Sequence, residues 1–159
     1  MVHRGIASLS GALMVCFLLL SYFEPSFFLL HLYQSLIYLI IILMLFYFED
    51  HWAYMLGMMA PAAWLLLTYG VGKLGGVLAH LARLLHVATP YEVKADAVTL
   101  LAVLTAVLSV VMIISCAYRW KREYAGMGRG WRTFATSLLI VVVYYGVLVL
   151  WFWNSIPRG

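Results

Sequence analysis

Five long runs of apolar residues, separated by short polar connections, occupy most of this chain of 159 residues. A helix rises about 1.5 Å per residue, so a run of roughly 20 apolar residues crosses a hydrocarbon layer about 30 Å thick. The runs cover residues 6–23, 27–48, 52–70, 95–118 and 133–153. The connections between them are too short to fold separately. The sequence therefore predicts an all-α fold, an integral membrane helical bundle in which residues 1–159 form a single transmembrane domain.

The composition favours a membrane environment. Only 10% of the residues are charged, whereas soluble domains have about 25%, and the mean hydropathy is +1.01. The net charge of +4 does not indicate a nucleic-acid partner. The basic residues stand at the ends of the apolar runs, which leaves no separate basic surface for a phosphate backbone. We expect the lipid bilayer as the environment and no nucleic acid as a partner.

The number of crossings depends on the first two runs. Residues 6–48 are too long for one crossing and long enough for two. Glu24 precedes Pro25, and proline disfavours helical backbone at the residue before it while fitting the first turn of the following helix. We therefore predict a hairpin at Glu24 and five transmembrane helices. An alternative with four crossings, in which the first segment is re-entrant or interfacial, stays open.

Residues 71–89 differ from the apolar runs. Lys73, His80 and Arg83 fall on one side of a helix in this segment, while leucine and valine recur at helical spacing. This pattern is typical of a helix that lies along the membrane surface. The sequence therefore predicts one interfacial amphipathic helix at residues 71–89.

The basic residues predict the orientation. The connection at residues 119–132 has five Arg and Lys residues and a single acid, Glu123, and short connections of this kind stay on the cytoplasmic side. With five crossings, Arg4 falls on that same side. We expect a cytoplasmic N-terminus, and the cytoplasmic (inner) membrane of a bacterium as the location.

One face of the second run departs from the apolar pattern. His31, Gln34, Ser35 and Tyr38 recur at offsets of three, four and seven residues, which places them on one side of a helix. In hydrocarbon such a face is expected to meet another helix, a cofactor or water. Hydrogen bonds between helices are the simplest interpretation. The alternatives are a cofactor site lined by these four residues and a polar translocation path.

In the cofactor alternative, His31 would ligate the metal of a haem or a chlorin, or bond to a quinone carbonyl. Axial ligation by two histidines needs a second histidine at similar depth, and no other span has a central one. A metal site built from Glu24, His31 and His80 stays a minor alternative, with the metal unknown. Cys16 and Cys116 belong to different spans at different depths, so we predict no disulfide between them.

Recognisable catalytic motifs are absent from the sequence. It has no HExxH zinc motif, no nucleophile elbow and no phosphate-binding loop, so no enzymatic activity is indicated. The predicted spans also lack a central Asp, Glu, Lys or Arg, which counts against a pump or coupled transporter.

The sequence thus favours a small accessory multi-pass subunit that packs against larger membrane-protein partners. A bioenergetic complex is its suggested setting, by analogy only. Two other functions stay open: an electron-transfer protein that binds haem, pigment or quinone through His31, and a small transporter or channel.

Overall fold

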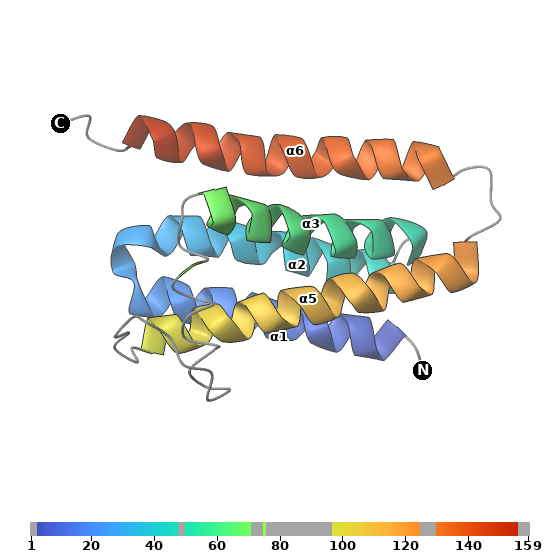
Figure 1. Cartoon of the computed structure of the whole chain (residues 1–159), viewed down its shortest axis with the longest axis horizontal. Coiled ribbons are helices and arrows are strands. Elements are labelled where there is room, and N and C mark those ends of the chain that lie inside the picture. The colour runs from blue at the N-terminus through green and yellow to red at the C-terminus, as the bar shows by residue number, and fades with distance from the viewer. Residues whose placement is uncertain (1–2, 48–49, 71–74, 76–96, 125–129, 156–159) are drawn as a thin grey trace.

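The computed structural model describes residues 3–47, 50–70, 75, 97–124 and 130–155, and their regular structure is helical (Figure 1). The elements are α1 (His3–Phe23), the short 3-10 helix η1 (Pro25–Phe27), α2 (Phe28–Tyr47), α3 (Asp50–Gly70), α5 (Ala97–Tyr124) and α6 (Gly130–Ser155). Each of the five predicted spans is a helix. The predicted all-α membrane bundle is confirmed, whereas the segment at residues 71–89 lies outside the described residues apart from Gly75.

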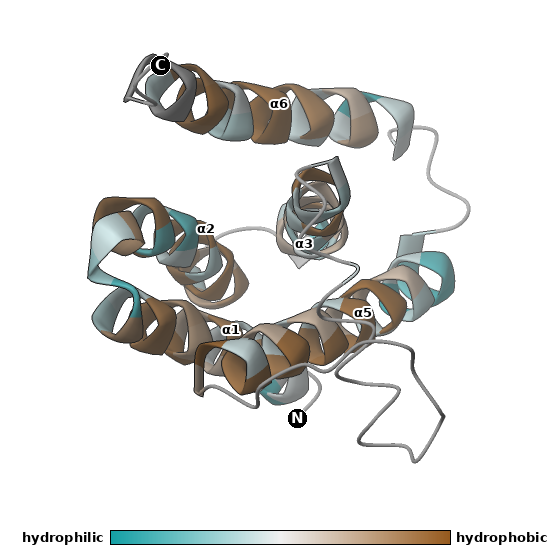
Figure 2. Ribbon diagram, turned by 60° about the vertical axis from the view of Figure 1, so that its left-hand side comes forward, coloured by the Kyte–Doolittle hydropathy of each residue, from teal (hydrophilic) through white to brown (hydrophobic). Residues whose placement is uncertain are grey.

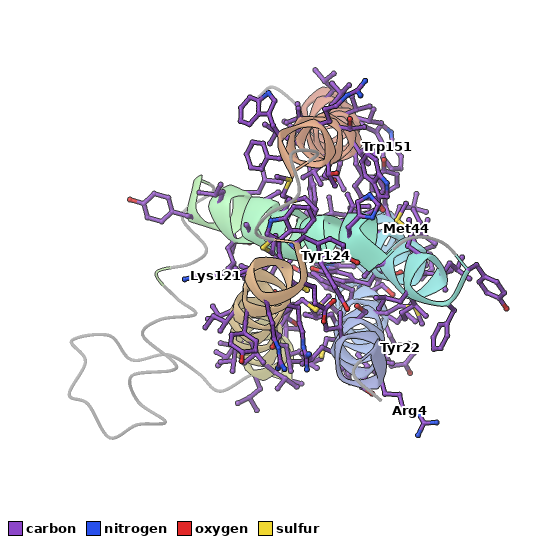
Figure 3. The ribbon with its side chains drawn as sticks, turned by 90° about the vertical axis from the view of Figure 1, so that its right-hand side faces the viewer. Arg4, Tyr22, Met44, Lys121, Tyr124 and Trp151 are labelled. Atoms are coloured by element: carbon purple, nitrogen blue, oxygen red, sulfur yellow. The ribbon has the colours of Figure 1, made fainter. Side chains whose placement is uncertain are left out.

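Successive long helices run in opposite directions along the bundle (Figure 1). The first residues of α1 therefore lie at one end of the bundle and the last residues of α6 at the other, as an odd number of passes requires. The start of α1, with Arg4, and the end of α5, with Lys121, lie at the same end of the bundle (Figure 1). That end faces the viewer in Figure 3. Arg132, in the first turn of α6, belongs to the same end.

Four of the helices are long and apolar enough to span a membrane: Arg4–Phe23, Pro25–Tyr47, Ala97–Tyr124 and Gly130–Trp151. Helix α3 has 21 residues, a length that matches a hydrocarbon layer of about 30 Å, but it is less apolar and is not one of the four. The segment that decides between four and five crossings is thus α3, and not the first segment, as the sequence had suggested.

Helix α3 lies in the middle of the bundle (Figure 2), in contact with α2, α5 and α6. Its residues Ala53, Tyr54, Leu56 and Ala60 are at most 1% exposed. Because protein rather than lipid surrounds this helix, it does not need an apolar side chain at every position. Its modest hydropathy is the composition expected of a central helix in a membrane bundle.

The predicted hairpin between the first two spans is confirmed. Helix α1 ends at Phe23, and Glu24 leaves helical geometry with φ −123° and ψ 73° before Pro25 starts the next turn. The Glu24 amide donates to the Leu20 carbonyl at 2.9 Å, and the Phe27 amide donates to the Glu24 carbonyl at 2.9 Å. These bonds close the turn, and α1 and α2 pack against each other along their length.

Helices α3 and α5 approach closely at Gly57. A Cβ added there would stand 2.7 Å from Cys116 Sγ and 3.0 Å from Met112 Cε, so the contact requires glycine. Cys16 and Cys116 are both free and buried, which confirms that no disulfide joins them.

Helix α5 continues to Tyr124, beyond the predicted end at residue 118. Its last turns are amphipathic rather than apolar. Arg119 pairs with Glu123 at 3.6 Å, and the rings of Trp120 and Tyr124 stack with centroids 5.3 Å apart. Contacts of this kind stabilise a helix outside the hydrocarbon layer, where hydropathy gives no signal.

Helix α6 lies at the edge of the bundle (Figures 1 and 2) and has α3 as its main neighbour. A single stripe of α6 is buried: Thr133, Ser137, Val141, Tyr145 and Leu148, which are at most 6% exposed. Most of its remaining surface is apolar and exposed, as expected for a helix whose outer side meets lipid.

Candidate functional site

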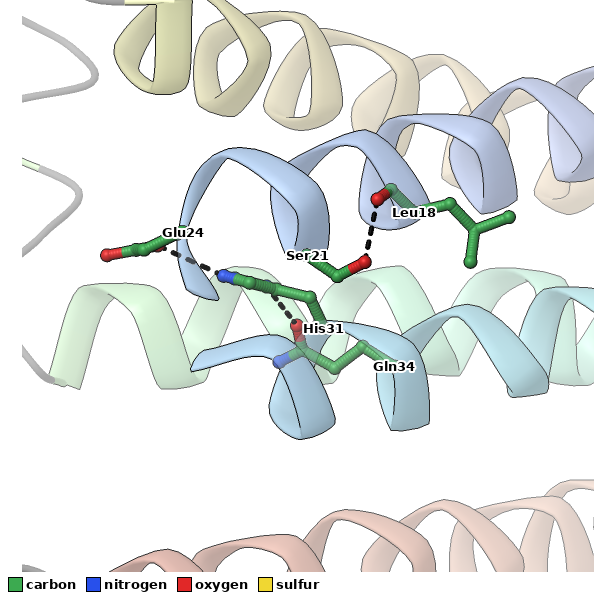
Figure 4. A network of polar contacts seen from close by, with 5 residues as sticks. All are labelled: Leu18, Ser21, Glu24, His31 and Gln34. Carbon is green, nitrogen blue, oxygen red and sulfur yellow. Dashed lines mark hydrogen bonds and ion pairs between the residues drawn. The ribbon is translucent and has the colours of Figure 1, made fainter. Parts of the chain in front are cut away.

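The first of the predicted polar residues, His31, lies at the hairpin end of the bundle and has contacts at both ring nitrogens (Figure 4). Its Nε2 is 3.1 Å from Glu24 Oε2, and its Nδ1 is 3.3 Å from Gln34 Oε1. The turn at Pro25 brings Glu24 back over the first turns of α2. The His31 side chain is 12% exposed and that of Glu24 28%, so the pair lies just inside the protein surface.

This arrangement bears on the predicted cofactor site. A metal ligand or a partner of a quinone carbonyl needs a ring nitrogen of His31, and each nitrogen already has a protein neighbour. Binding a haem, a chlorin or a quinone would therefore break the contact with Glu24 or with Gln34. Within the described residues, no cluster of three or more His, Cys, Asp or Glu residues could hold a metal ion. His80 lies outside those residues, so a site that includes it is untested.

The rest of the polar face does not act as one unit. Ser35 is buried, but its hydroxyl donates to the Leu32 carbonyl of its own helix at 2.7 Å. Ser21 does the same with the Leu18 carbonyl on α1, also at 2.7 Å (Figure 4). A serine that bonds to its own helix satisfies its hydroxyl without linking two helices. His31 and Gln34 thus form a cluster at the hairpin end, and Ser35 stays outside it.

Tyr38, the fourth predicted residue, belongs to the centre of the bundle. Its side chain is fully buried, and its ring stacks on Phe17 of α1 with centroids 5.6 Å apart. Phe17 also meets Trp64 of α3 edge to face at 5.5 Å. Aromatic pairs of this geometry add about 0.5–1.5 kcal/mol each beyond the area they bury. Three helices are therefore joined at this point by rings rather than by polar groups.

The hydroxyl of Tyr38 has different neighbours from those of its ring. It lies close enough to Ser109 of α5 to interact with it. Tyr145 of α6 also lies near enough to interact electrostatically with Tyr38. Across the described part of the chain, five buried hydroxyls have no hydrogen-bond partner in the protein: those of Ser10, Tyr38, Ser109, Ser137 and Tyr145.

A pair of tyrosines joins α2 to the outlying α6. The rings of Tyr33 and Tyr144 stack with centroids 4.3 Å apart. The Tyr33 hydroxyl donates to the Tyr144 carbonyl at 3.2 Å, and the Tyr144 hydroxyl donates in return to the Tyr33 carbonyl. We call this pair the tyrosine clasp. Beside it lies an apolar groove of about 410 Å³, lined by Tyr33, Leu139, Ile140, Val143, Tyr144 and Val147.

Sequence reasoning identified Tyr38 but missed its neighbours. Phe17 looks like any other apolar residue of its span, so no signal singles it out. Ser109 belongs to a row on α5 with Thr105, Met112 and Cys116, all fully buried, and their helical spacing could have been read. Tyr144 and Tyr145 are the only residues with polar side chains between Ile140 and Leu150, which was a usable signal as well.

The chain was compared with models of protein families, with curated proteins and with solved structures, and none of the three comparisons gave a match.

Proposed function

We propose that this integral membrane protein is a small accessory subunit that packs against a larger membrane protein through the outer side of α6. The observation that carries the proposal is the position of α6. This helix is attached to the bundle through one buried stripe and the tyrosine clasp, and five of its residues line an open groove.

The polar groups of the interior support a packing role. The hairpin cluster links His31 to Glu24 and Gln34, and Ser35 bonds to its own helix, so these groups are already occupied by contacts within the chain. Most of the surface left for a partner is apolar and lies on the spanning helices. A protein with such a surface meets its partners inside the membrane.

The occupant that fits the groove best is a transmembrane helix of the partner. Lipid tails are as apolar as leucine, so helices associate in membranes through close packing and shape rather than through the hydrophobic effect. The groove supplies such a shape between α2 and α6, where the tyrosine clasp and branched aliphatic residues of α6 line it. Side chains from a neighbouring helix could interdigitate there.

For the orientation, we propose that the end with Arg4, Lys121 and Arg132 faces the cytoplasm of a bacterial cell. Basic residues next to transmembrane helices stay on that side, and the arrangement of the helices supports the proposal by gathering these three residues at one end.

The test is photocrosslinking from two matched valines in native membranes at native expression. Val143 is 56% exposed and lines the groove, whereas Val15 is 49% exposed on α1, away from it. A photoreactive residue at position 143 should crosslink to one discrete, larger membrane protein, and the same residue at position 15 should give only lipid adducts.

Two results would overturn the proposal. One is that both positions yield lipid adducts alone. The other is that position 143 yields adducts only with further copies of this chain, while the protein migrates as a lone monomer in native electrophoresis. Substitution of tryptophan for Leu139, which lines the same groove, should also weaken the non-covalent association, so that without crosslinking the same partner no longer copurifies in mild detergent.

A further inference from the structure

We propose that the outer face of α5 binds an anionic phospholipid, whose acyl chains lie along an apolar stripe and whose phosphate group meets Lys121 and Arg122. This outer stripe consists of five residues at helical spacing, each 41–62% exposed: Leu100, Val107, Val111, Ile114 and Tyr118. The stripe belongs to α5, whereas the groove proposed for the partner lies between α2 and α6. The inference therefore does not depend on the proposed partner.

Burial places the outer stripe on the membrane side of α5. The opposite side of this helix is a fully buried row, made of Thr105, Ser109, Met112 and Cys116. Ile114 stands two residues from Met112 and from Cys116, and two residues of an α-helix are about 200° apart. In the most apolar window of α5, only 22% is buried inside the protein. The buried row thus faces the bundle, and the outer stripe faces the hydrocarbon.

The length of the stripe matches one leaflet of a bilayer. From Val107 to Tyr118 the helix rises about 16 Å at 1.5 Å per residue, which is close to half of a hydrocarbon layer about 30 Å thick. An exposed tyrosine at this height is typical of the membrane interface. Lys121 and Arg122 follow about 5 Å further along the helix, within a headgroup layer of roughly 5–7 Å. Aliphatic, aromatic and cationic groups thus follow one another in the order in which a phospholipid needs them.

The charges at the end of the stripe identify the ligand as anionic. Lys121 and Arg122 are exposed and form no ion pair with the described residues, whereas Arg119 pairs with Glu123 at 3.6 Å. Lys121 lies at the outside of the bundle in Figure 3. Because Lys121 and Arg122 stand three and four residues beyond Tyr118, they lie on either side of the end of the stripe. Two cations in this position complement a phosphate group, and the apolar stripe below them favours a lipid over a soluble acidic protein.

The experiment is a lipid competition followed by native mass spectrometry of the full chain in detergent. Dioleoyl phosphatidylglycerol and dioleoyl phosphatidylcholine, which differ in net charge but have the same acyl chains, are supplied in equal amounts. We expect the unmodified chain to bind phosphatidylglycerol about 10–30-fold better, the effect of two basic residues at an anionic surface. In Lys121→Gln/Arg122→Gln the preference should fall to about threefold or less.

The matched control removes two other cations from the same end of the bundle. Arg4 on α1 and Arg132 on α6 are both exposed, so Arg4→Gln/Arg132→Gln makes the same change in net charge away from the stripe. Its preference should stay within about twofold of that of the unmodified chain, because solvent screens charges that are not in contact with the lipid. Equal loss of preference in the two double variants, or no preference in the unmodified chain, would overturn the proposal.

Two further arms distinguish a lipid from a free phosphate ion. Dioctanoyl phosphatidylglycerol should bind several times more weakly than the dioleoyl lipid, because its shorter chains leave part of the outer stripe uncovered. Inorganic phosphate should displace the dioleoyl lipid no better than chloride does at the same ionic strength. If chain length had no effect, or if inorganic phosphate displaced the lipid, the two cations would be binding a phosphate group alone, and the proposed lipid site would be wrong.

Discussion

Helices α3 and α6 are opposite solutions to the same problem of placing a helix in a membrane. Helix α3 is not among the four helices that are long and apolar enough to span a membrane, and it lies in the middle of the bundle, where α2, α5 and α6 cover it. Helix α6 meets the spanning criterion easily, yet only 28% of its most apolar window is buried in the protein.

The difference shows that hydropathy and burial by protein run in opposite directions here. A helix that faces lipid must be apolar all around its outer side, because lipid tails offer no hydrogen-bond partner to a polar side chain. A helix that faces other helices can use small or polar residues, as Gly57 and Tyr54 do on α3. In a bundle of this kind, the strongest hydropathy signal marks the periphery and not the core.

The largest expected effect separates a buried leucine from an exposed one. Leu56 on α3 is 1% exposed, and Leu150 on α6 is 66% exposed. Leu56→Ala should lower the free energy of unfolding by about 2–5 kcal/mol, since it leaves a cavity, whereas Leu150→Ala should change it by less than about 0.5 kcal/mol. Unfolding in detergent measures both. Equal losses of unfolding free energy in the two variants would mean that α6 is as tightly packed as α3, which would contradict the difference between the two helices.

A smaller effect is expected at the close approach of α3 and α5. Gly57→Ala should cost about 1–3 kcal/mol, as overpacking does, because the new methyl group meets Cys116 Sγ at 2.7 Å. Cys116→Ala removes that sulfur and should restore most of the loss in the double variant. A thermodynamic cycle over the four proteins gives the coupling. If the effects of the two substitutions on the free energy of unfolding were additive, α3 and α5 would not be in close contact at this point.

The tyrosine clasp tests how weakly α6 is attached. Tyr144→Ala removes a ring stack and the hydrogen bond that the Tyr144 hydroxyl donates to the Tyr33 carbonyl, and we expect a loss of about 1–2 kcal/mol. The control is Tyr118→Ala on α5. The Tyr118 side chain is 61% exposed, so its loss should not weaken the attachment of α6. Limited proteolysis should then cut the α5–α6 connection faster in the Tyr144 variant alone. Unchanged stability and proteolysis would show that α3 by itself holds α6.

The smallest effect concerns the hairpin cluster. Glu24→Gln should cost about 0.6 kcal/mol, the average for a polar contact between membrane helices, and Ser35→Ala, which loses only a bond within its own helix, should cost less. A loss several times larger would mean that the pair of Glu24 and His31 holds the hairpin together. In the same preparations, a visible absorption band that disappears in His31→Ala would instead support the haem or chlorin alternative.

Much of the fold could be predicted from the sequence, because hydropathy and proline act locally. The break at Glu24 follows from the geometry of the proline that comes after it, and every predicted apolar run is a helix. The extension of α5 to Tyr124 was missed, since its last turns are amphipathic and give no apolar signal. The central position of α3 was missed as well, because which helix the others surround depends on packing between distant segments.

The candidate site was less accessible to prediction. The polar face of α2 was identified from its spacing, but the sequence presents His31 and Tyr38 as equivalent members of one row. The structure separates them: Glu24 holds His31 at the hairpin end, and Phe17 and Ser109 surround Tyr38 in the centre. The partners of both come from other segments, and no helical period on α2 can reveal them.

The peripheral place of α6 also has a consequence for synthesis. The contacts among α1, α2, α3 and α5 do not involve it, and α6 begins at Gly130, after these four helices in the chain. Helix α6 has 26 residues, so at about 5–20 residues per second the first four long helices have about 1–5 seconds to associate while α6 is being made. Among the five long helices α6 therefore arrives last, at a surface that the other four have already formed, and the groove between α2 and α6 exists only once α6 has docked.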